Sequence, residues 1–322
     1  SCTQVAAASL ARRVKTAAAR TAMGPRITPK TLTEGARLRS LSSRSACSPR
    51  PRTHGESSPV ISTVRPPAVA GSFYPGDPSE LAGTVDALLA HAPIATGPCP
   101  KALVVPHAGY VYSGPVAASA FARVAPYASQ IERVVLVGPA HRVWVEGLVW
   151  PGAAQLATPL GTVEVDLEAI ASLPEVSPDR GAHAREHCLE VELPFLQRVA
   201  PHAKLVPLVA GHASAEEVGQ ALEALWGGPE TLIVISSDLS HYLPYAVGRA
   251  ADRHTAARIL SLEPSLSGEE ACGAVGINGL LWVARKKQLR LELVDLRSSG
   301  DTAGPRDEVV GYGAFAAYEE AA

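Results

Sequence analysis

The sequence predicts an α/β protein in which a largely parallel central sheet is flanked by helices. Three short apolar runs carry this prediction: residues 103–105, 134–137 and 232–235. Each run is too short for a helix and is rich in Val, Leu and Ile, which is typical of a buried strand. Stretches with helical spacing separate the runs. Consecutive strands would therefore be joined by crossover helices and run parallel.

A histidine follows each of these three runs. The residues are His107, His141 and His241. Ligands of open α/β sheets bind in the crevice beyond the carboxyl ends of the strands, where loops from separate strands converge. A single histidine is more often a hydrogen-bonded helper of a loop or of the core. Three histidines in the same place relative to three strands favour one shared site.

The start of the chain has a different composition from the rest. Residues 1–58 contain eleven Lys and Arg, two acidic residues, and much Ala, Ser, Thr and Pro. Such a segment cannot bury a core, so we expect residues 1–60 to be a disordered basic N-terminal extension and residues 61–320 to be the folded domain. The composition is also that of a transit peptide, although a start assigned too far upstream explains it equally well. The segment lacks aromatic residues, so it is weak evidence for nucleic-acid binding.

The remainder of the chain carries 18 basic and 29 acidic residues, which gives it a formal charge of −11. This charge argues against a nucleic-acid surface. No run of 18 apolar residues occurs, so we expect no membrane span. The five cysteines are widely spaced and include no CxxC pair. They argue against a disulfide framework or a zinc ribbon and favour a reducing compartment, which predicts a cytoplasmic protein.

Other elements follow from local patterns. A helix begins at Asp77-Pro78, and its apolar residues recur with helical spacing through Leu89. Residues 114–124 predict an alanine-rich helix, and residues 147–150 and 161–165 predict the strands of a local hairpin-like elaboration. The remaining expected elements are strands at 205–209, 291–296 and 311–317, helices at 166–173, 215–226 and 245–260, and a helix that runs to Arg285.

Residues 184–197 also have a helical pattern, and they bring in further polar groups. His187 is a fourth histidine, and Glu190 and Glu192 are two carboxylates. The simplest interpretation of the carboxylates is a solvated helix face. Cys188, within the same amphipathic stretch, is expected to be a small packed side chain.

Cys272 precedes a glycine at the expected start of the helix that runs to Arg285. Backbone dipoles at a helix N-terminus stabilise a thiolate, and a thiolate is both a nucleophile and a metal ligand. Spacing alone leaves both roles for Cys272 open.

Several ordered motifs resemble the Memo family, and in particular its bacterial members called AmmeMemoRadiSam system protein B. The resemblance covers residues 64–319, and the basic N-terminal segment lies outside it. The motifs are residues 70–74 (AGSFY), 106–110 (PHAGY), 138–141 (GPAH), 186–194 (EHCLEVELP), 236–241 (SSDLSH) and 272–273 (CG).

The resemblance implies a fold like that of class III extradiol dioxygenases, with one metal-site crevice. In the Memo family two histidines and a cysteine bind the metal, and these match His107, His141 and Cys272. The dioxygenases use two histidines and a glutamate, with a further histidine as acid/base, and His241 matches that last position. Asp238 stands beside it.

The resemblance also places His187 on a family histidine near the pocket. Arg142 is a departure, because some relatives carry a second histidine there.

Two histidines and one anionic ligand suit non-haem Fe(II), and a thiolate in place of a carboxylate makes copper or zinc a competitor. We therefore expect a metal-binding protein, with iron (Fe²⁺) preferred, that acts as a dioxygenase-like oxidoreductase on a small-molecule substrate or ligand in the metal pocket. His241 would move a proton, and Asp238 or His187 would orient the ligand.

Two alternatives stay open. One is a non-catalytic metal-binding or redox-signalling protein, with a radical-enzyme system as its partner, as the family name implies. The other is a zinc-dependent hydrolase in which the metal activates water. A Cys/His nucleophile without metal would leave the additional histidines without a role. Tyr110, Tyr112 and Tyr242 are compatible with an aromatic ligand, and equally with core packing.

Overall fold

The computed structural model describes residues 62–94, 97–173 and 175–319. The predicted disordered extension over residues 1–60 lies outside the described residues. In the part of the chain that is described, none of the helices is both long and apolar enough to span a membrane.

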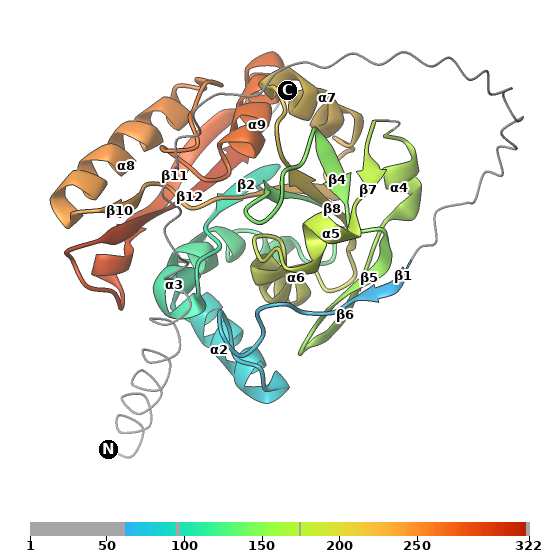
Figure 1. The fold of residues 1–322 in the computed structure, drawn as a ribbon, viewed down its shortest axis with the longest axis horizontal. Coiled ribbons are helices and arrows are strands. Elements are labelled where there is room, and N and C mark those ends of the chain that lie inside the picture. Colours follow the sequence, from blue (N-terminus) through green and yellow to red (C-terminus); the bar gives the residue numbers. More distant parts are fainter. Residues whose placement is uncertain (1–61, 95–96, 174, 320–322) are drawn as a thin grey trace, which may run out of the picture. The chain divides into compact units, whose positions relative to one another are not determined.

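The fold is mixed α/β, with a curled nine-stranded central sheet flanked by helices (Figure 1). Parallel pairing joins the four middle strands and the short β4–β7 pair, whereas the other pairs of this sheet are antiparallel. The expected largely parallel sheet is therefore correct for the middle of the sheet only. In spatial order the strands are β10 (His241–Leu243), β12 (Val309–Tyr318), β2 (Ala102–Val105), β9 (Thr231–Ser236), β3 (Arg133–Pro139), β8 (Lys204–Ala210), β4 (Leu148–Trp150) and β7 (Ser177–Pro178), with β11 (Arg290–Ser298) paired to β12.

A second, three-stranded sheet contains β1 (Ser62–Arg65), β5 (Ala153–Thr158) and β6 (Gly161–Glu164). The expected hairpin is present, but β5 and β6 form it. Strand β4 instead pairs with β8 in the main sheet. The sequence of β5, AAQLAT, has few β-branched residues, so its pattern did not predict a strand.

Helices pack on the central sheet in two groups. Helix α7 lies against α9, and α9 contacts β3 and β9, while α3 contacts β2 and packs on α2 and α6. Helix α8 lies against β11 and β12. The helices are α2 (Pro78–His91), α3 (Tyr110–Phe121), α4 (Leu167–Ala171), α5 (Arg180–Ala184), α6 (Leu193–Val199), α7 (Ala215–Ala224), α8 (Tyr245–Leu260) and α9 (Ala274–Lys287), with 3-10 turns η1 (Ala125–Tyr127), η2 (Glu190–Glu192) and η3 (Ser299–Asp301).

Local sequence explains where the helices begin. The Asp77 side chain caps α2 by accepting from Glu80 N at 2.9 Å, as the sequence predicted. At α7, Ser214 and Glu217 form a capping box. Each cap satisfies backbone N–H groups that have no partner within the helix.

The expected helix over residues 184–197 is wrong in one respect, because it is interrupted. Helix α5 ends at Ala184, a turn follows, and η2 leads into α6. The side chain of Glu186 accepts hydrogen bonds from the N–H groups of His187 and Cys188, which competes with helical pairing. Pro194 stands in the first turn of α6, where its missing N–H is tolerated.

This interruption turns Glu190 and Glu192 inward. Both residues are 0% exposed, so the expectation of a solvated helix face is wrong. Sequence periodicity places side chains on a face only while the helix continues, and here it does not.

A buried ion pair fastens this segment to the start of the domain. The Arg65 guanidinium pairs with Glu190 and donates to the carbonyl oxygen of His183 at 2.9 and 3.1 Å. Glu190 also accepts from Tyr74 Oη at 2.6 Å and from Val69 N at 2.9 Å. The chain before α2 is thereby held against the η2 segment.

We predict that Arg65→Met lowers the free energy of unfolding by about 3–5 kcal/mol, because it leaves the charge of Glu190 buried without its partner. Chemical denaturation at pH 7 measures this loss. The matched control is Arg198→Met, which breaks an ion pair with Asp86 in which both side chains are more than 40% exposed. That change should cost at most about 1 kcal/mol. Equal losses in the two variants would contradict the prediction.

Candidate metal centre

The parallel strands β2, β9 and β3 are neighbours in the sheet, and their carboxyl ends build the candidate site. His107 stands two residues beyond β2, His141 two residues beyond β3, and Asp238 two residues beyond β9. The rings of His107 and His141 lie 5.1 Å apart between centroids, so the structure brings these two of the three strand-end histidines together. His241 begins β10, which runs along β12.

His187 joins the two histidines from the turn after α5. Its ring centroid lies 5.0 Å from that of His141 and 5.5 Å from that of His107. One ring nitrogen from each of the three histidines lies within 4.8 Å of the others. His107 is 2% exposed, whereas the side chain of His141 is 26% exposed, so the cluster reaches solvent on the His141 side.

His107 is held on both ring nitrogens. Its Nδ1 lies 2.8 Å from Ser236 Oγ, and its Nε2 lies 3.3 Å from Cys272 Sγ. Its backbone N donates to Asp238 Oδ1 at 2.9 Å. Burial, reinforced by the neighbouring histidines, lowers the pKa of His107 well below its ordinary value. The ring is therefore neutral at pH 7, which is the state that binds metals.

Glu186 orients the other two histidines, and the sequence analysis did not single it out. Its carboxylate accepts from His141 N at 2.7 Å, His141 Nδ1 at 2.9 Å and His187 N at 2.8 Å. His187 Nδ1 lies 3.3 Å from the same carboxylate. Burial alone would raise the pKa of Glu186, but these hydrogen bonds outweigh it and lower the pKa far below the ordinary value. The available signal was an acid directly before a candidate ligand, since such ligands usually donate to a carboxylate.

Cys272 lies beside this cluster, immediately before the N-cap Gly273 of α9. Asp238 N donates to the Cys272 sulfur at 3.3 Å, and Cys272 N donates to Asp238 O at 3.2 Å. Burial and the nearby charge of Asp238 raise the pKa of the Cys272 thiol to about 12. The thiol form is therefore favoured in the protein without a bound ion, and both roles considered for Cys272 stay predictions. Desolvation outweighs the backbone dipoles here.

Gly273 allows this close approach. A Cβ atom at Gly273 would lie 2.6 Å from Ser236 O and from Ser237 Cβ, so a side chain there would push α9 away from β9. Gly138 has the same role at the end of β3, where a Cβ atom would lie 2.6 Å from Cys188 Sγ. Cys188 itself is fully buried and donates to Pro139 O at 3.2 Å, which agrees with its expected packing role.

His241 is the residue predicted to move a proton, and Asp238 is one of the two residues predicted to orient the ligand. Burial raises the pKa of Asp238 to about 7, although the hydrogen bond from His107 N opposes that shift. Burial lowers the pKa of His241. Next to it, Tyr242 has a φ of +57° and is 64% exposed. A left-handed conformation is uncommon for a non-glycine residue and often accompanies functional sites.

Phe73 contacts the histidine cluster, whereas Tyr110 belongs to the hydrophobic core. The Phe73 ring lies 4.7 Å from the His187 ring, and it comes from the segment held by the Arg65–Glu190 pair. Tyr110 is 4% exposed and donates through its hydroxyl to Val191 O at 2.7 Å. Of the two interpretations of Tyr110, core packing is the correct one.

The donor set suits a metal ion, although its third member is open. Among the described residues, His107, His141 and His187 each place one ring nitrogen within 4.8 Å of the other two, which is close enough for one ion to bind all three. Cys272 adjoins His107 Nε2 but lies outside that group. The predicted set of His107, His141 and Cys272 therefore remains a prediction.

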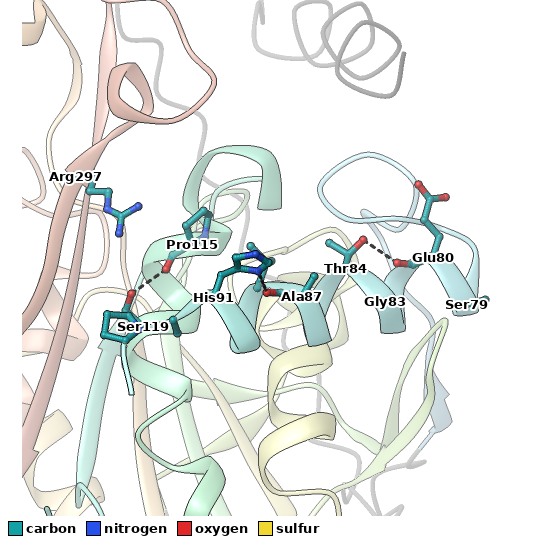
Figure 2. A pocket seen from close by; sticks show the side chains of 12 residues that line it. Ser79, Glu80, Gly83, Thr84, Ala87, His91, Pro115, Ser119 and Arg297 are labelled. Atoms are coloured by element: carbon teal, nitrogen blue, oxygen red, sulfur yellow. Dashed lines mark hydrogen bonds between the residues drawn. The ribbon is translucent and has the colours of Figure 1, made fainter. Parts of the chain in front are cut away.

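A separate groove lies between α2, α3 and β11 (Figure 2). It has a volume of about 660 Å³, and Leu88, His91, Pro115 and Arg297 are among its lining residues. None of the residues that line it is one of the predicted site residues.

Comparison with known proteins gives one consistent result. The family described as "Memo-like protein" matches residues 65–316. A "MEMO1 family protein" of Aquifex aeolicus is 38% identical over 272 residues, covering 77% of this chain and 97% of the relative. Relatives of the same description from Archaeoglobus fulgidus and Ignicoccus hospitalis are 36% and 34% identical, again with 97% of each relative covered.

We predict that Glu186→Gln lowers the free energy of unfolding by about 1.5–3 kcal/mol at pH 7, because hydrogen bonds to a charged group become hydrogen bonds to a neutral one. Glu186 has a depressed folded-state pKa, so its contribution is present above its unfolded value of 4.5 and is lost as the pH falls below it. Urea unfolding at several pH values between 3 and 8 measures the difference between wild type and variant.

The matched control is Glu146→Gln, whose carboxylate is 74% exposed beside His212. It should have little effect at any pH. If the difference in free energy of unfolding between wild type and Glu186→Gln stayed constant from pH 8 down to pH 3, Glu186 would not be ionised in the folded protein.

Proposed function

The chain belongs to the family of Memo-like proteins, and from this premise we propose that it binds one metal ion, preferably Fe²⁺, through His107, His141 and Cys272. We further propose that it is a dioxygenase-type oxidoreductase with a small-molecule substrate in the metal pocket, and that its fold is related to the class III extradiol dioxygenases.

The observation that carries this proposal is the way the two strand-end histidines are held. Glu186 is an ionised carboxylate that only accepts, so His141 Nδ1 carries the hydrogen and Nε2 is the ring nitrogen left for a metal ion. Metal-binding histidines are typically fixed in this manner through their other ring nitrogen. His107 has the corresponding contact to Ser236 Oγ.

Cys272 supplies the third donor of the proposed set. Its thiol is protonated without an ion, and a bound cation would favour the thiolate and release the proton. Two imidazoles and one anionic ligand that leave positions open are typical of non-haem Fe(II) sites. In such a site the ion supplies redox chemistry and open positions for a substrate and oxygen.

The chain's own residues would handle the proton. His241 has a neutral imidazole at pH 7 that can accept a proton from a substrate hydroxyl group. The Asp238 carboxylate accepts from His107 N, its backbone N donates to the Cys272 sulfur, and its backbone O accepts from Cys272 N, so Asp238 would orient both ligands. His187 closes the pocket against Phe73 and would orient the bound ligand.

A zinc-dependent hydrolase is a second candidate, and one specific observation favours it. Three histidine nitrogens within 4.8 Å of one another are a donor set that also suits a catalytic zinc ion. In that case His187 would replace Cys272 as the third ligand, and the site would activate water.

We predict that protein loaded anaerobically with Fe²⁺, and carrying no metal-binding affinity tag, retains close to one iron per chain. His107→Ala and Cys272→Ala should lose it, because each removes a ligand. Elemental analysis after desalting measures the content. His254→Ala is the matched control, since His254 is exposed and lies on α8. His187→Ala separates the two candidates: retention of iron supports Cys272 as the third ligand, and loss with retention in Cys272→Ala supports the three-histidine set.

Equal and negligible metal in all variants and in the wild type would overturn the metal proposal. Cys272 should then be tested as a nucleophile. Iron binding that never admits nitric oxide or a catechol would instead favour a non-catalytic redox-signalling role, with a radical-enzyme system as the proposed partner.

We predict that His241→Ala keeps the iron but lowers oxygen-dependent turnover of a catechol-type substrate by about 100-fold to 10,000-fold, because the proton acceptor is lost. Oxygen consumption and iron content are measured on the same preparations. His254→Ala serves again as the control. Full turnover by the His241→Ala variant would contradict the role assigned to His241.

A further inference from the structure

Three glutamates of one short segment are almost completely excluded from solvent. Glu186 is 2% exposed, and Glu190 and Glu192 are 0% exposed. Two of them have partners for a negative charge: Glu186 accepts from three backbone N–H groups and from His141, and Glu190 pairs with Arg65. Glu192 is buried to the same degree without such partners.

The surroundings of Glu192 do not compensate a negative charge. Its Oε1 lies 2.9 Å from Ser236 Oγ, and its Oε2 is buried without a hydrogen-bond partner. The titratable groups that face it are Asp238, Tyr110 and Cys188, none of which is a cation. An isolated buried carboxylate is so costly that it takes up a proton instead. In agreement, burial raises the pKa of Glu192 well above its ordinary value, against the opposing effect of the Ser236 hydrogen bond.

We propose that Glu192 is a neutral carboxylic acid in the folded protein, that it donates a hydrogen bond to Ser236 Oγ, and that through Ser236 it is a positioning residue for His107. The first two statements are independent of metal binding. The third deepens the proposed function, because it rests on His107 being a ligand.

The hydrogen bonds at Ser236 support this assignment. Three groups surround the Ser236 hydroxyl: Cys188 O at 2.7 Å, His107 Nδ1 at 2.8 Å and Glu192 Oε1 at 2.9 Å. The hydroxyl has one hydrogen and two lone pairs, and the carbonyl oxygen can only accept. If the hydrogen goes to Cys188 O, the other two groups must both donate. A protonated Glu192 and an Nδ1–H tautomer of His107 then satisfy all three contacts of the Ser236 hydroxyl.

The same arrangement leaves His107 Nε2 with its lone pair, directed at the side where Cys272 Sγ lies at 3.3 Å. A protonated thiol can donate to that lone pair in the protein without an ion, and a metal ion would use the same lone pair. An ionised Glu192 would instead attract the Ser236 hydrogen and leave Cys188 O without it. Glu192 thus acts on His107 through the direction of one hydroxyl group.

The decisive experiment compares unfolding of the wild type and Glu192→Gln in urea between pH 5 and 9. The variant keeps the size and a donor to Ser236 Oγ. The folded wild type would hold one proton that the unfolded chain releases above its ordinary value of 4.5. The unfolding constant of the wild type relative to the variant should therefore rise with pH above pH 5, by up to about tenfold per pH unit, until the pH reaches the folded-state pKa of Glu192.

A ratio that is flat from pH 5 to pH 9 would overturn the proposal, because Glu192 would then be ionised in both states. Glu146→Gln, on the exposed surface, is the control and should give a flat ratio. Infrared spectroscopy of the wild type and Glu192→Gln gives a second measurement at pH 7. A carboxylic-acid carbonyl band in the wild type that is absent from Glu192→Gln supports the proposal, and no such band overturns it.

Histidine nitrogen NMR of the metal-free protein tests the positioning role. The wild type and Glu192→Gln should show the His107 hydrogen on Nδ1. In Glu192→Met the Ser236 hydroxyl loses its donor and can turn toward His107, so both tautomers should be populated. An unchanged tautomer in Glu192→Met and in Ser236→Ala would overturn the positioning role.

Iron content, measured separately, distinguishes this inference from the proposed function. A flat unfolding ratio with iron still bound means that only the inference about Glu192 fails. A ratio that rises with pH while no preparation binds iron supports the neutral acid and overturns the metal proposal.

Discussion

The candidate site depends on the hydrogen bonds that the buried carboxylate of Glu186 accepts. This carboxylate binds the loop after β3 and the turn after α5 through backbone N–H groups on both, and it fixes the ring of His141. A helix that continued through residue 186 would leave no N–H groups free for this purpose. The interrupted helix is therefore the condition for the site, and the hydrogen bonds of one buried charge replace the helical pairing that is lost.

A second buried charge, that of Arg65, contacts the same segment. Arg65 reaches the carbonyl oxygens of the α5 turn and pairs with Glu190, so strand β1 and the chain before α2 close over the segment. The same closure brings Phe73 against His187. The buried ion pair thus also holds the segment that places Phe73 beside the histidine cluster.

The sequence predicted the middle of the fold and the convergence of His107 and His141, because strand runs and strand ends are local patterns. It did not predict the inward direction of Glu190 and Glu192, because that depends on where a helix stops. The side chain of Glu186 ends the helix by accepting from backbone N–H groups, and hydrophobic periodicity does not show such a contact. The sequence also did not predict the raised pKa of the Cys272 thiol, because desolvation and charge depend on neighbours such as Asp238 that are distant in sequence. The sequence did not predict strand β5 because tertiary pairing overrode its weak β-strand propensity.

The charges of the site suit a cation in a specific way. His107 is neutral, the Cys272 thiol is protonated, and Glu192 has no partner for a negative charge, so Glu186 is the strongly ionised group among them. A site with several ionised acids would repel itself and demand an ion in order to fold. Here the negative charge that a cation requires can come from Cys272 at the moment of binding, because the cation stabilises the thiolate. In the proposed metal site, Cys272 would therefore supply an anionic donor only when an ion binds, and the folded protein without an ion would not hold a buried, unpaired thiolate.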